Sequence, residues 1–257
     1  MKNALVVYEK SPERKEFPIL LWADEYLKGM GYEPVYMDLG EGLEGDLYRY
    51  HMEQVKPEFL ITLDLAGYSI ELLGGDLFYN SLCCPALHIL LKHPEEYGER
   101  LQARVNFNMT YLTTEAEDLS ILKSIPRVTE CDCLEFPGAL REEHRPIELF
   151  LPGNATDSLT FRLAQGLSED GIPLCVAGKG WMEHPLENVQ ALGEDGVNLE
   201  QLWPVLQNTQ VILDATTDWK MGRPEWRFMA AMAGCTHLPL QKIHLPALYE
   251  KLSQILN

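Results

Sequence analysis

Short apolar runs alternate with longer stretches of helical periodicity through the first half of the chain. Continuous apolar runs are typical of strands that are buried on both faces of a parallel sheet. The pattern predicts strands at 4–8, 33–37, 59–64 and 86–91, and one more within 105–112. It predicts helices at 13–30, 46–55, 95–103 and 114–124, with Thr114 as the N-cap of the last. Because parallel strands need crossover connections, this series predicts a doubly wound sheet.

The periodic pattern breaks after residue 134, where two prolines, a glycine and the charged run 141–145 replace it. Such composition is typical of a linker. We therefore expect a domain at 1–136, a linker at 137–146 and a second domain at 147–257. A new series follows the linker, with strands at 147–151, 173–177, 189–192 and 211–213 and helices at 156–167, 199–206 and 245–255. The sequence thus predicts an α/β protein of two Rossmann-like, doubly wound parallel-sheet units that face each other across a cleft.

Three loops of the second predicted unit each follow the carboxyl end of a strand. In an α/β sheet these ends meet at one edge, where ligands bind, and glycine lets the backbone approach a ligand closely. Basic side chains beside such loops suit a diphosphate or a nucleotide-sugar. Each loop taken alone is equally consistent with ordinary turn chemistry. The candidate binding residues are Gly153, Asn154, Gly178, Lys179, Gly180, Trp181, Thr216, Thr217, Gly222, Arg223, Glu225 and Arg227.

Some of these candidates have structural alternatives. Glu225 opens the helical segment after the third loop, where a carboxylate also serves as a helix N-terminal charge. Three tryptophans crowd the same predicted edge, at Trp181, Trp219 and Trp226. Their rings either stack on a base or sugar, or pack in the core.

In the first unit, Asp64 and His93 each lie just past a predicted parallel strand. An imidazole titrates near neutral pH, so His93 is a candidate general base for a hydroxyl, with Asp64 as a second catalytic candidate. The alternative for His93 is to satisfy backbone groups at the turn before Pro94. His88 lies inside an apolar strand, which indicates a core position.

The chain carries 39 acidic and 21 basic residues, for a formal net charge of −18. An acidic surface repels phosphate backbones and anionic lipid, which argues against nucleic acid or membrane surfaces as partners. No apolar run approaches the roughly 20 residues of a membrane span, and the first strand starts at once, so we expect a cytoplasmic protein. The six cysteines form no Cys-x-x-Cys pair, and we expect buried thiols and no metal site.

Several sequence fingerprints of enzyme classes do not occur in the chain. It has no Gly-x-Gly-x-x-Gly and no P-loop motif, which argues against dinucleotide dehydrogenases and P-loop kinases. It has no Gly-x-Ser-x-Gly elbow and no His-Glu-x-x-His helix, which argues against α/β-hydrolases and zinc peptidases.

The segments VQALG (189–193), NLEQLWPVLQNTQVILDAT (198–216) and GRPEWRFMAAMAG (222–234) resemble the carboxyl-terminal half of two-domain glycosyltransferases of the GT-B fold. Within that fold they are most similar to the group of spore-maturation glycosyltransferases. The Gly178-Lys179-Gly180-Trp181 loop and the Ala233-Gly234 turn resemble elements of the same group. The resemblance implies metal-independent transfer of a sugar, without a cofactor, from a nucleotide-sugar held by the second unit to an acceptor held by the first.

The chain departs from this pattern at the helix that follows the third loop. The resembling enzymes place a glutamate after the helix phenylalanine to bind the donor ribose, whereas Met229 follows Phe228 here. Glu225 lies one helical turn away and is a substitute on the same face. This difference leaves a second hypothesis open, a non-catalytic GT-B-like protein that binds a ligand or scaffolds a partner. A third is a two-lobed binding protein.

Overall fold

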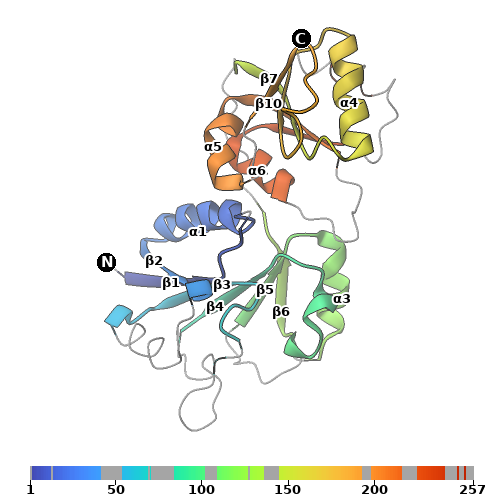
Figure 1. The fold of residues 1–257 in the computed structure, drawn as a ribbon. Helices are drawn as coiled ribbons and strands as arrows, with labels where there is room; N and C mark the ends of the chain where they lie inside the picture. The colour runs from blue at the N-terminus through green and yellow to red at the C-terminus, as the bar shows by residue number, and fades with distance from the viewer. Residues whose placement is uncertain are drawn as a thin grey trace. The chain divides into compact units, whose positions relative to one another are not determined.

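The computed structural model describes residues 2–12, 14–41, 54–68, 70, 84–101, 109–126, 128–135, 145–192, 198–215, 225–240, 248 and 252. The chain divides into two compact units. Unit 1 comprises Met1–Ser11 and Ile19–Glu135, and unit 2 comprises Pro12–Pro18 and Phe136–Asn257. Each unit is built on one parallel sheet with helices beside it (Figure 1). The predicted α/β class with two parallel-sheet units is confirmed.

Unit 1 contains a six-stranded sheet in the order β2-β1-β3-β4-β5-β6. All five strand pairings are parallel. The strand order reverses at β1, which pairs with β2 on one side and β3 on the other. The strands are β1 (Lys2–Tyr8), β2 (Tyr32–Asp38), β3 (Phe59–Leu63), β4 (Ala86–Leu90), β5 (Met109–Thr113) and β6 (Glu130–Cys133). The helices are α1 (Phe17–Gly29), η1 (Leu39–Glu41), η3 (Pro94–Leu101), η4 (Ala116–Asp118) and α3 (Leu119–Ser124).

Two local predictions for unit 1 are wrong, and one strand was not predicted. The helix expected at 95–103 is the 3-10 segment η3, which Gly98 interrupts with φ 50° and ψ −127°. Thr114 is not an N-cap, because η4 intervenes and α3 begins after Asp118. Strand β6 was not predicted, since its sequence Glu-Cys-Asp-Cys has no apolar run and alternates between exposed and half-buried positions. The expected helix at 46–55 lies almost wholly outside the described residues.

The strands of unit 1 bury a polar side chain among their apolar ones. Leu5, Leu60 and Leu90 are fully buried in one cluster on the sheet. His88, on β4, is 1% exposed, as its core position in the sequence predicted. Its Nδ1 bonds with the Thr62 hydroxyl, and its Nε2 lies 3.0 Å from Sδ of Met109. Burial lowers the pKa of His88 to about 4, so the folded protein holds this imidazole neutral.

Unit 2 contains a five-stranded sheet in the order β11-β10-β7-β8-β9, again with parallel pairings throughout. From β7 the chain builds outward through β8 and β9, then returns to the other side of β7 with β10 and β11. The gap between β7 and β10 is therefore the topological switch point of this sheet. The elements are β7 (Ile147–Pro152), α4 (Ser158–Glu169), β8 (Leu174–Ala177), β9 (Val189–Ala191), α5 (Leu199–Gln207), β10 (Thr209–Asp214), α6 (Glu225–Ala233) and β11 (Thr236–Pro239).

Helices cover both faces of the unit 2 sheet. Leu149 and Leu151 of β7 pack in a cluster with α4, while Phe150 between them packs in a cluster with α5 and α6. Successive strand residues point to opposite faces, so this alternation places α4 on one face and α5 with α6 on the other. Unit 2 is therefore doubly wound, as predicted.

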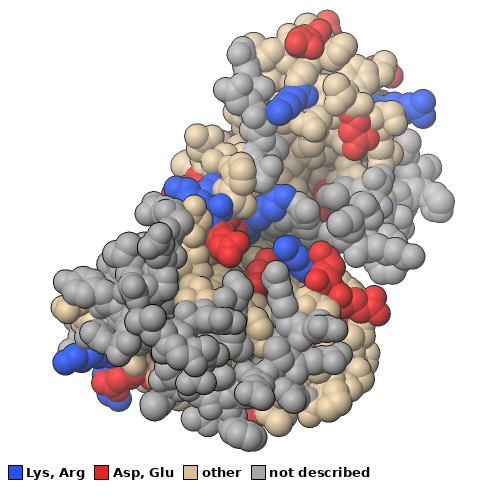
Figure 2. Space-filling view, turned by 60° about the horizontal axis from the view of Figure 1, so that its bottom comes forward, with Lys and Arg blue, Asp and Glu red and all other residues tan. Residues whose placement is uncertain are grey.

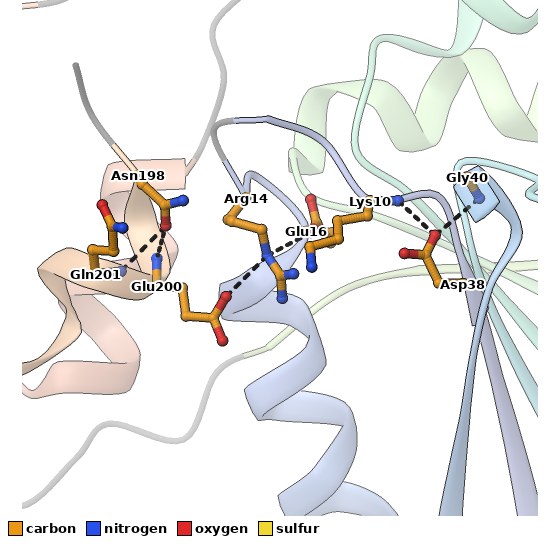
Figure 3. Close-up of polar contacts among 8 residues, drawn as sticks. All are labelled: Lys10, Arg14, Glu16, Asp38, Gly40, Asn198, Glu200 and Gln201. Carbon is orange, nitrogen blue, oxygen red and sulfur yellow. Dashed lines mark hydrogen bonds and ion pairs between the residues drawn. The ribbon is translucent and has the colours of Figure 1, made fainter. Parts of the chain in front are cut away.

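The segment Pro12–Pro18 follows β1 in sequence but belongs to unit 2. The ring of Phe17 lies 6.0 Å from that of Trp203, edge to face, and Nε of Arg14 lies 3.0 Å from Glu16 and 3.2 Å from Glu200 (Figure 3). No local pattern indicated this assignment, and the periodicity predicted a single helix at 13–30 in the first domain. The predicted linker at 137–146 lies mostly outside the described residues and stays a prediction, as does the cleft.

No helix within the described part of the chain is both long enough and apolar enough to cross a membrane.

His88 makes the stability of the protein depend on pH. The unfolded chain binds this proton near pH 6.5 and the folded protein near pH 4, so the unfolded state holds more protons between these values. We therefore expect the free energy of unfolding to fall by about 2 kcal/mol between pH 7 and pH 5 through this residue. Urea denaturation at both pH values should show that His88→Asn, which cannot titrate, loses this part of the dependence. The exposed His184→Gln should keep it, and identical pH dependence in wild type and His88→Asn would refute the assignment.

Candidate functional site

The loops singled out in the sequence lie at neighbouring strand ends. Strands β10, β7 and β8 are adjacent and parallel, so the segments that follow them leave from one edge of the sheet. This confirms that the three strand ends share one edge. Thr216, Thr217, Gly222 and Arg223, in the third loop, lie outside the described residues, and α6 begins at Glu225.

The loops after β7 and β8 are bonded into one rigid element. Asn154 Oδ1 accepts a hydrogen bond from the Lys179 N–H at 2.9 Å, and the Lys179 carbonyl accepts one from the Ala155 N–H at 2.9 Å. The indole N–H of Trp181 donates to the Gly153 carbonyl at 2.7 Å. We call the bonded segments 153–155 and 178–181 the paired loops. Their hydrogen bonds fix both backbones at the edge next to the switch point.

The contact between the paired loops requires glycine at residue 178. Gly178 has φ 147°, and a Cβ built there would lie 2.2 Å from the carbonyl oxygen of Gly153. Gly180 has φ 86°, a left-handed conformation that side chains disfavour. These glycines therefore allow one loop to lie directly against the other.

Two of the tryptophans suggested for stacking on a ligand are packing residues instead. Trp181 is 3% exposed and stacks on Phe161 with centroids 6.2 Å apart. Trp226 is half-buried, with its ring edge to face with Phe150 at 5.9 Å. Trp219 lies outside the described residues. The Trp181 indole contributes to the site by holding Gly153 in place rather than by offering a face to a ligand.

The paired loops leave hydrogen-bond donors unused. No described residue accepts a hydrogen bond from the backbone N–H of Asn154, Gly178 or Gly180. The Lys179 side chain is exposed beside them. Asp157, by contrast, caps α4 by accepting from the Leu159 N–H at 2.9 Å, so the start of this helix already carries a carboxylate. An anion at this edge would therefore meet the loop amides and Lys179 more favourably than the start of α4.

Among the remaining basic candidates, Arg227 is exposed on α6, with its guanidinium carbon 5.2 Å from the centre of the Phe228 ring. On the face drawn in Figure 2, the described Lys and Arg side chains lie among Asp and Glu.

In unit 1, Asp64 directly follows β3 in a strained backbone. Asp64 and Leu65 are consecutive left-handed residues, with φ 52° and 56°. Oδ1 of Asp64 accepts hydrogen bonds from the Leu91 N–H at 2.8 Å and from the Tyr97 hydroxyl. Burial raises the pKa of Asp64, while these two hydrogen bonds lower it. Strained residues with perturbed carboxyls concentrate at functional sites, which supports Asp64 as a candidate.

His93 follows the neighbouring strand β4, and its imidazole is 36% exposed. Nε2 lies 3.5 Å from Oδ1 of Asp118, whose other oxygen accepts a hydrogen bond from the Thr113 hydroxyl at 3.2 Å. Nδ1 accepts from the Glu95 N–H at 3.4 Å, so the backbone-satisfying role expected as the alternative is also present. Burial raises the pKa of Asp118, while the Thr113 hydrogen bond and the nearby His93 lower it.

Sequence reasoning missed Asp118, Thr113 and Tyr97. Asp118 and Tyr97 fell inside predicted helices, and Thr113 fell between a predicted strand and the next predicted helix, so no local signal marked them. It also missed the pair that Asp214 on β10 forms with His237 on β11, where Nε2 and Oδ2 lie 3.0 Å apart. The position of Asp214 at a strand end was the available signal.

Comparison with solved structures shows the same fold in glycosyltransferases. The glycosyltransferase SnogD from Streptomyces nogalater matches with a TM-score of 0.50 and 14% identity, covering 100% of this chain and 90% of that chain. An alpha-glucosyltransferase in complex with UDP and a 13-mer DNA matches with a TM-score of 0.54 and 8% identity, covering 93% and 79%. The alpha-glucosyltransferase complex with UDP-glucose and DNA containing an abasic site gives 0.52 and 10%, covering 92% and 79%.

The sequence matches no family model and no curated protein. Because the structural matches are at low identity, they show the fold alone. That fold is the two-unit α/β fold of GT-B glycosyltransferases. They do not confirm the spore-maturation group that the sequence motifs resemble.

The close contact of the paired loops predicts the effect of adding one methyl group. We expect Gly178→Ala to lower the free energy of unfolding by about 3 kcal/mol, because the Cβ collides with the Gly153 carbonyl and the backbone conformation is strained. Gly171→Ala is the matched control, since Gly171 has φ 72° but open space around it. It should lose only about 1 kcal/mol. Equal losses for both variants in urea denaturation would show that the loop contact is not tight.

Proposed function

We propose that the protein is a glycosyltransferase that moves a sugar from a nucleotide-sugar to a hydroxyl acceptor. The observation that carries this proposal is the pair of bonded glycine loops at the switch point of unit 2, where no described residue accepts from the N–H groups of Asn154, Gly178 and Gly180. The GT-B type of fold supports it, because α/β sheets bind ligands at this edge. The paired loops and Lys179 would hold the diphosphate of the donor.

Unit 1 would hold the acceptor at the carboxyl edge of its own sheet. Asp64 and His93 follow the neighbouring strands β3 and β4, and both are half-buried residues with proton-accepting groups of the kind that bind hydroxyls. In the transfer step the acceptor O–H gives its proton to the base, and the acceptor oxygen bonds to the anomeric carbon. The bond from that carbon to the diphosphate breaks, and the nucleoside diphosphate leaves with the electron pair.

A second candidate function is ligand binding without transfer. Met229 is fully buried in the core formed with α5, so the position where the resembling enzymes carry a ribose-binding glutamate points into the protein here. A carboxylate could not replace it without burying a charge. This observation favours a GT-B-like protein that binds a ligand such as a nucleotide-sugar without transferring the sugar.

Binding and turnover together distinguish the two functions. UDP-sugars are the first probes, because one alpha-glucosyltransferase of similar fold has been seen with UDP and with UDP-glucose; GDP-, ADP- and TDP-sugars follow. We expect the best donor to raise the melting temperature by about 5 °C at a hundredfold excess over its Kd, since binding then adds about 2.7 kcal/mol.

The variant Lys179→Gln should raise the Kd of that donor roughly tenfold, because it removes one charged contact with the diphosphate. Lys123→Gln, an exposed lysine on α3 of unit 1, should leave the Kd unchanged. Release of nucleoside diphosphate from the bound donor supports the transferase, and binding without release supports the second candidate. If no donor raises the melting temperature, both proposals are wrong.

A further inference from the structure

The side chain of Tyr97, on η3, contacts Asp64 at the end of β3. We infer that Tyr97 is a positioning residue, which holds Asp64 so that Oδ2 of its carboxylate accepts a hydrogen bond from the acceptor hydroxyl. The acceptor part of this inference rests on the proposed function. The contact between Tyr97 and Asp64 is a property of the fold alone.

The carboxylate of Asp64 replaces a backbone carbonyl at the end of the ladder between β3 and β4. The Asp64 N–H donates to the Ile89 carbonyl at 2.9 Å, as parallel pairing requires. The next bond of the ladder would join the Leu91 N–H to the Asp64 carbonyl, but Leu91 donates to Oδ1 of Asp64 instead, at 2.8 Å. The left-handed backbone of Asp64 and Leu65 turns the chain away at this point. The sheet itself therefore holds the Asp64 side chain.

Tyr97 supplies the second hydrogen bond to Oδ1. Its hydroxyl accepts from the Lys92 N–H at 3.1 Å, and because it has one proton, it donates that proton to Asp64. The ring is 6% exposed and packs in the same cluster as Leu90 and Tyr111, which fixes the hydroxyl in place. Both lone pairs of Oδ1 are then occupied.

The other carboxylate oxygen of Asp64 stays open. Oδ2 receives no hydrogen bond within the part of the chain that the structure describes, and it is not fully buried. An ionised carboxylate only accepts hydrogen bonds, so a ligand that bonds to Oδ2 must offer a donor such as a hydroxyl. Asp64 thus turns one oxygen to the sheet and keeps the other for a ligand at the carboxyl edge of unit 1, where α/β sheets bind ligands.

Tyr97 also favours the ionised form of Asp64. Burial raises the pKa of this carboxyl, and the Tyr97 hydrogen bond is the strongest of the contacts that lower it, ahead of the Leu91 N–H and Lys92. Glu96, which lies beside Tyr97 on η3, raises the pKa of Asp64. Burial and the charge of Asp64 raise the pKa of Tyr97, so the phenol keeps the proton that it donates. Tyr97 therefore offsets part of the cost of burying the carboxylate.

The contact can be tested without turnover. Carbon-13 NMR of labelled aspartate follows the ionisation of each carboxyl with pH, and the signal that Asp64→Asn lacks is that of Asp64. We expect Tyr97→Phe, which loses only the hydroxyl, to raise the midpoint of this titration by about one pH unit, since a hydrogen bond to a charge is lost. Tyr111→Phe is the matched control, because Tyr111 is a buried tyrosine of the same cluster that does not bond to Asp64. It should leave the midpoint unchanged.

A second measurement needs no variant of Tyr97. Incorporation of meta-fluorotyrosine makes each phenol a stronger hydrogen-bond donor, so the midpoint of Asp64 should fall because Tyr97 donates to it. This measurement decides the inference if Tyr97→Phe folds poorly.

Hydrolysis of the donor tests the acceptor contact, with water as the acceptor. The water oxygen bonds to the anomeric carbon, its proton passes to solvent, and the nucleoside diphosphate leaves with the electron pair of the broken bond. With the best-binding of the UDP-, GDP-, ADP- and TDP-sugars, we expect Tyr97→Phe to lower kcat about tenfold with the donor KM within about twofold. The acid limb of its pH profile should move upward by about one unit, because Asp64 must be ionised to hold the water.

The pH profile separates a positioning role from a structural one. Loss of folded protein would lower kcat at every pH and leave the acid limb in place. Tyr111→Phe should keep both the kcat and the limb of the wild type.

The two proposals fail separately. An Asp64 midpoint that Tyr97→Phe and meta-fluorotyrosine do not move, or that Tyr111→Phe moves equally, overturns the inference whether or not the protein transfers sugar. An acid limb that stays in place in Tyr97→Phe overturns the acceptor contact. Absence of turnover in the wild type overturns the transferase and the acceptor contact with it, while the NMR midpoint still decides whether Tyr97 holds Asp64.

Discussion

Parallel pairing of the strands is the constraint on which the rest of this structure depends. Each described pairing in both sheets is parallel, so the connection after each strand must carry the chain back from the carboxyl edge of the sheet to its amino edge. The segments that begin at carboxyl ends are therefore collected along one edge of each sheet. Residues far apart in sequence, such as Gly153 and Gly178 or His93 and Asp118, become neighbours for this reason.

The carboxyl edges of the two sheets have different chemistry. The edge of unit 2 offers backbone N–H groups and Lys179, which suit an anion. The edge of unit 1 offers carboxylates and an imidazole, which accept protons and hydrogen bonds from hydroxyls. A reaction between a phosphorylated sugar donor and a hydroxyl acceptor needs both kinds of surface, and this division is the physical basis of the proposed transferase.

Much of the fold followed from local patterns. Strands β3, β4 and β10 were predicted because burial on both faces demands continuous apolar runs, and His88 was placed in the core for the same reason. Strand β6 was not predicted because it lies at the edge of its sheet, where alternate side chains are exposed and no apolar run forms. The assignment of Pro12–Pro18 to unit 2 depends on contacts such as Phe17 with Trp203, which no local pattern encodes.

The candidate site was predictable only as far as strand ends can be recognised. Asp64, His93 and the glycine loops were found because each follows an apolar run. Asp118 and Thr113 were not, since their importance comes from contact with His93 across two connections. Trp181 was selected as a ring that could stack on a ligand, but its ring is buried and its indole N–H bonds to the Gly153 carbonyl.

Hydrogen–deuterium exchange of the whole protein, with and without a saturating nucleotide-sugar, tests whether the paired loops hold the donor. We expect slower exchange in peptides that cover 153–157 and 178–181, because a bound diphosphate would occupy amides of the paired loops. The turn at 170–173, before β8 at the opposite edge of the same sheet, should not change. Protection at that turn without protection of the paired loops would contradict donor binding at the paired loops.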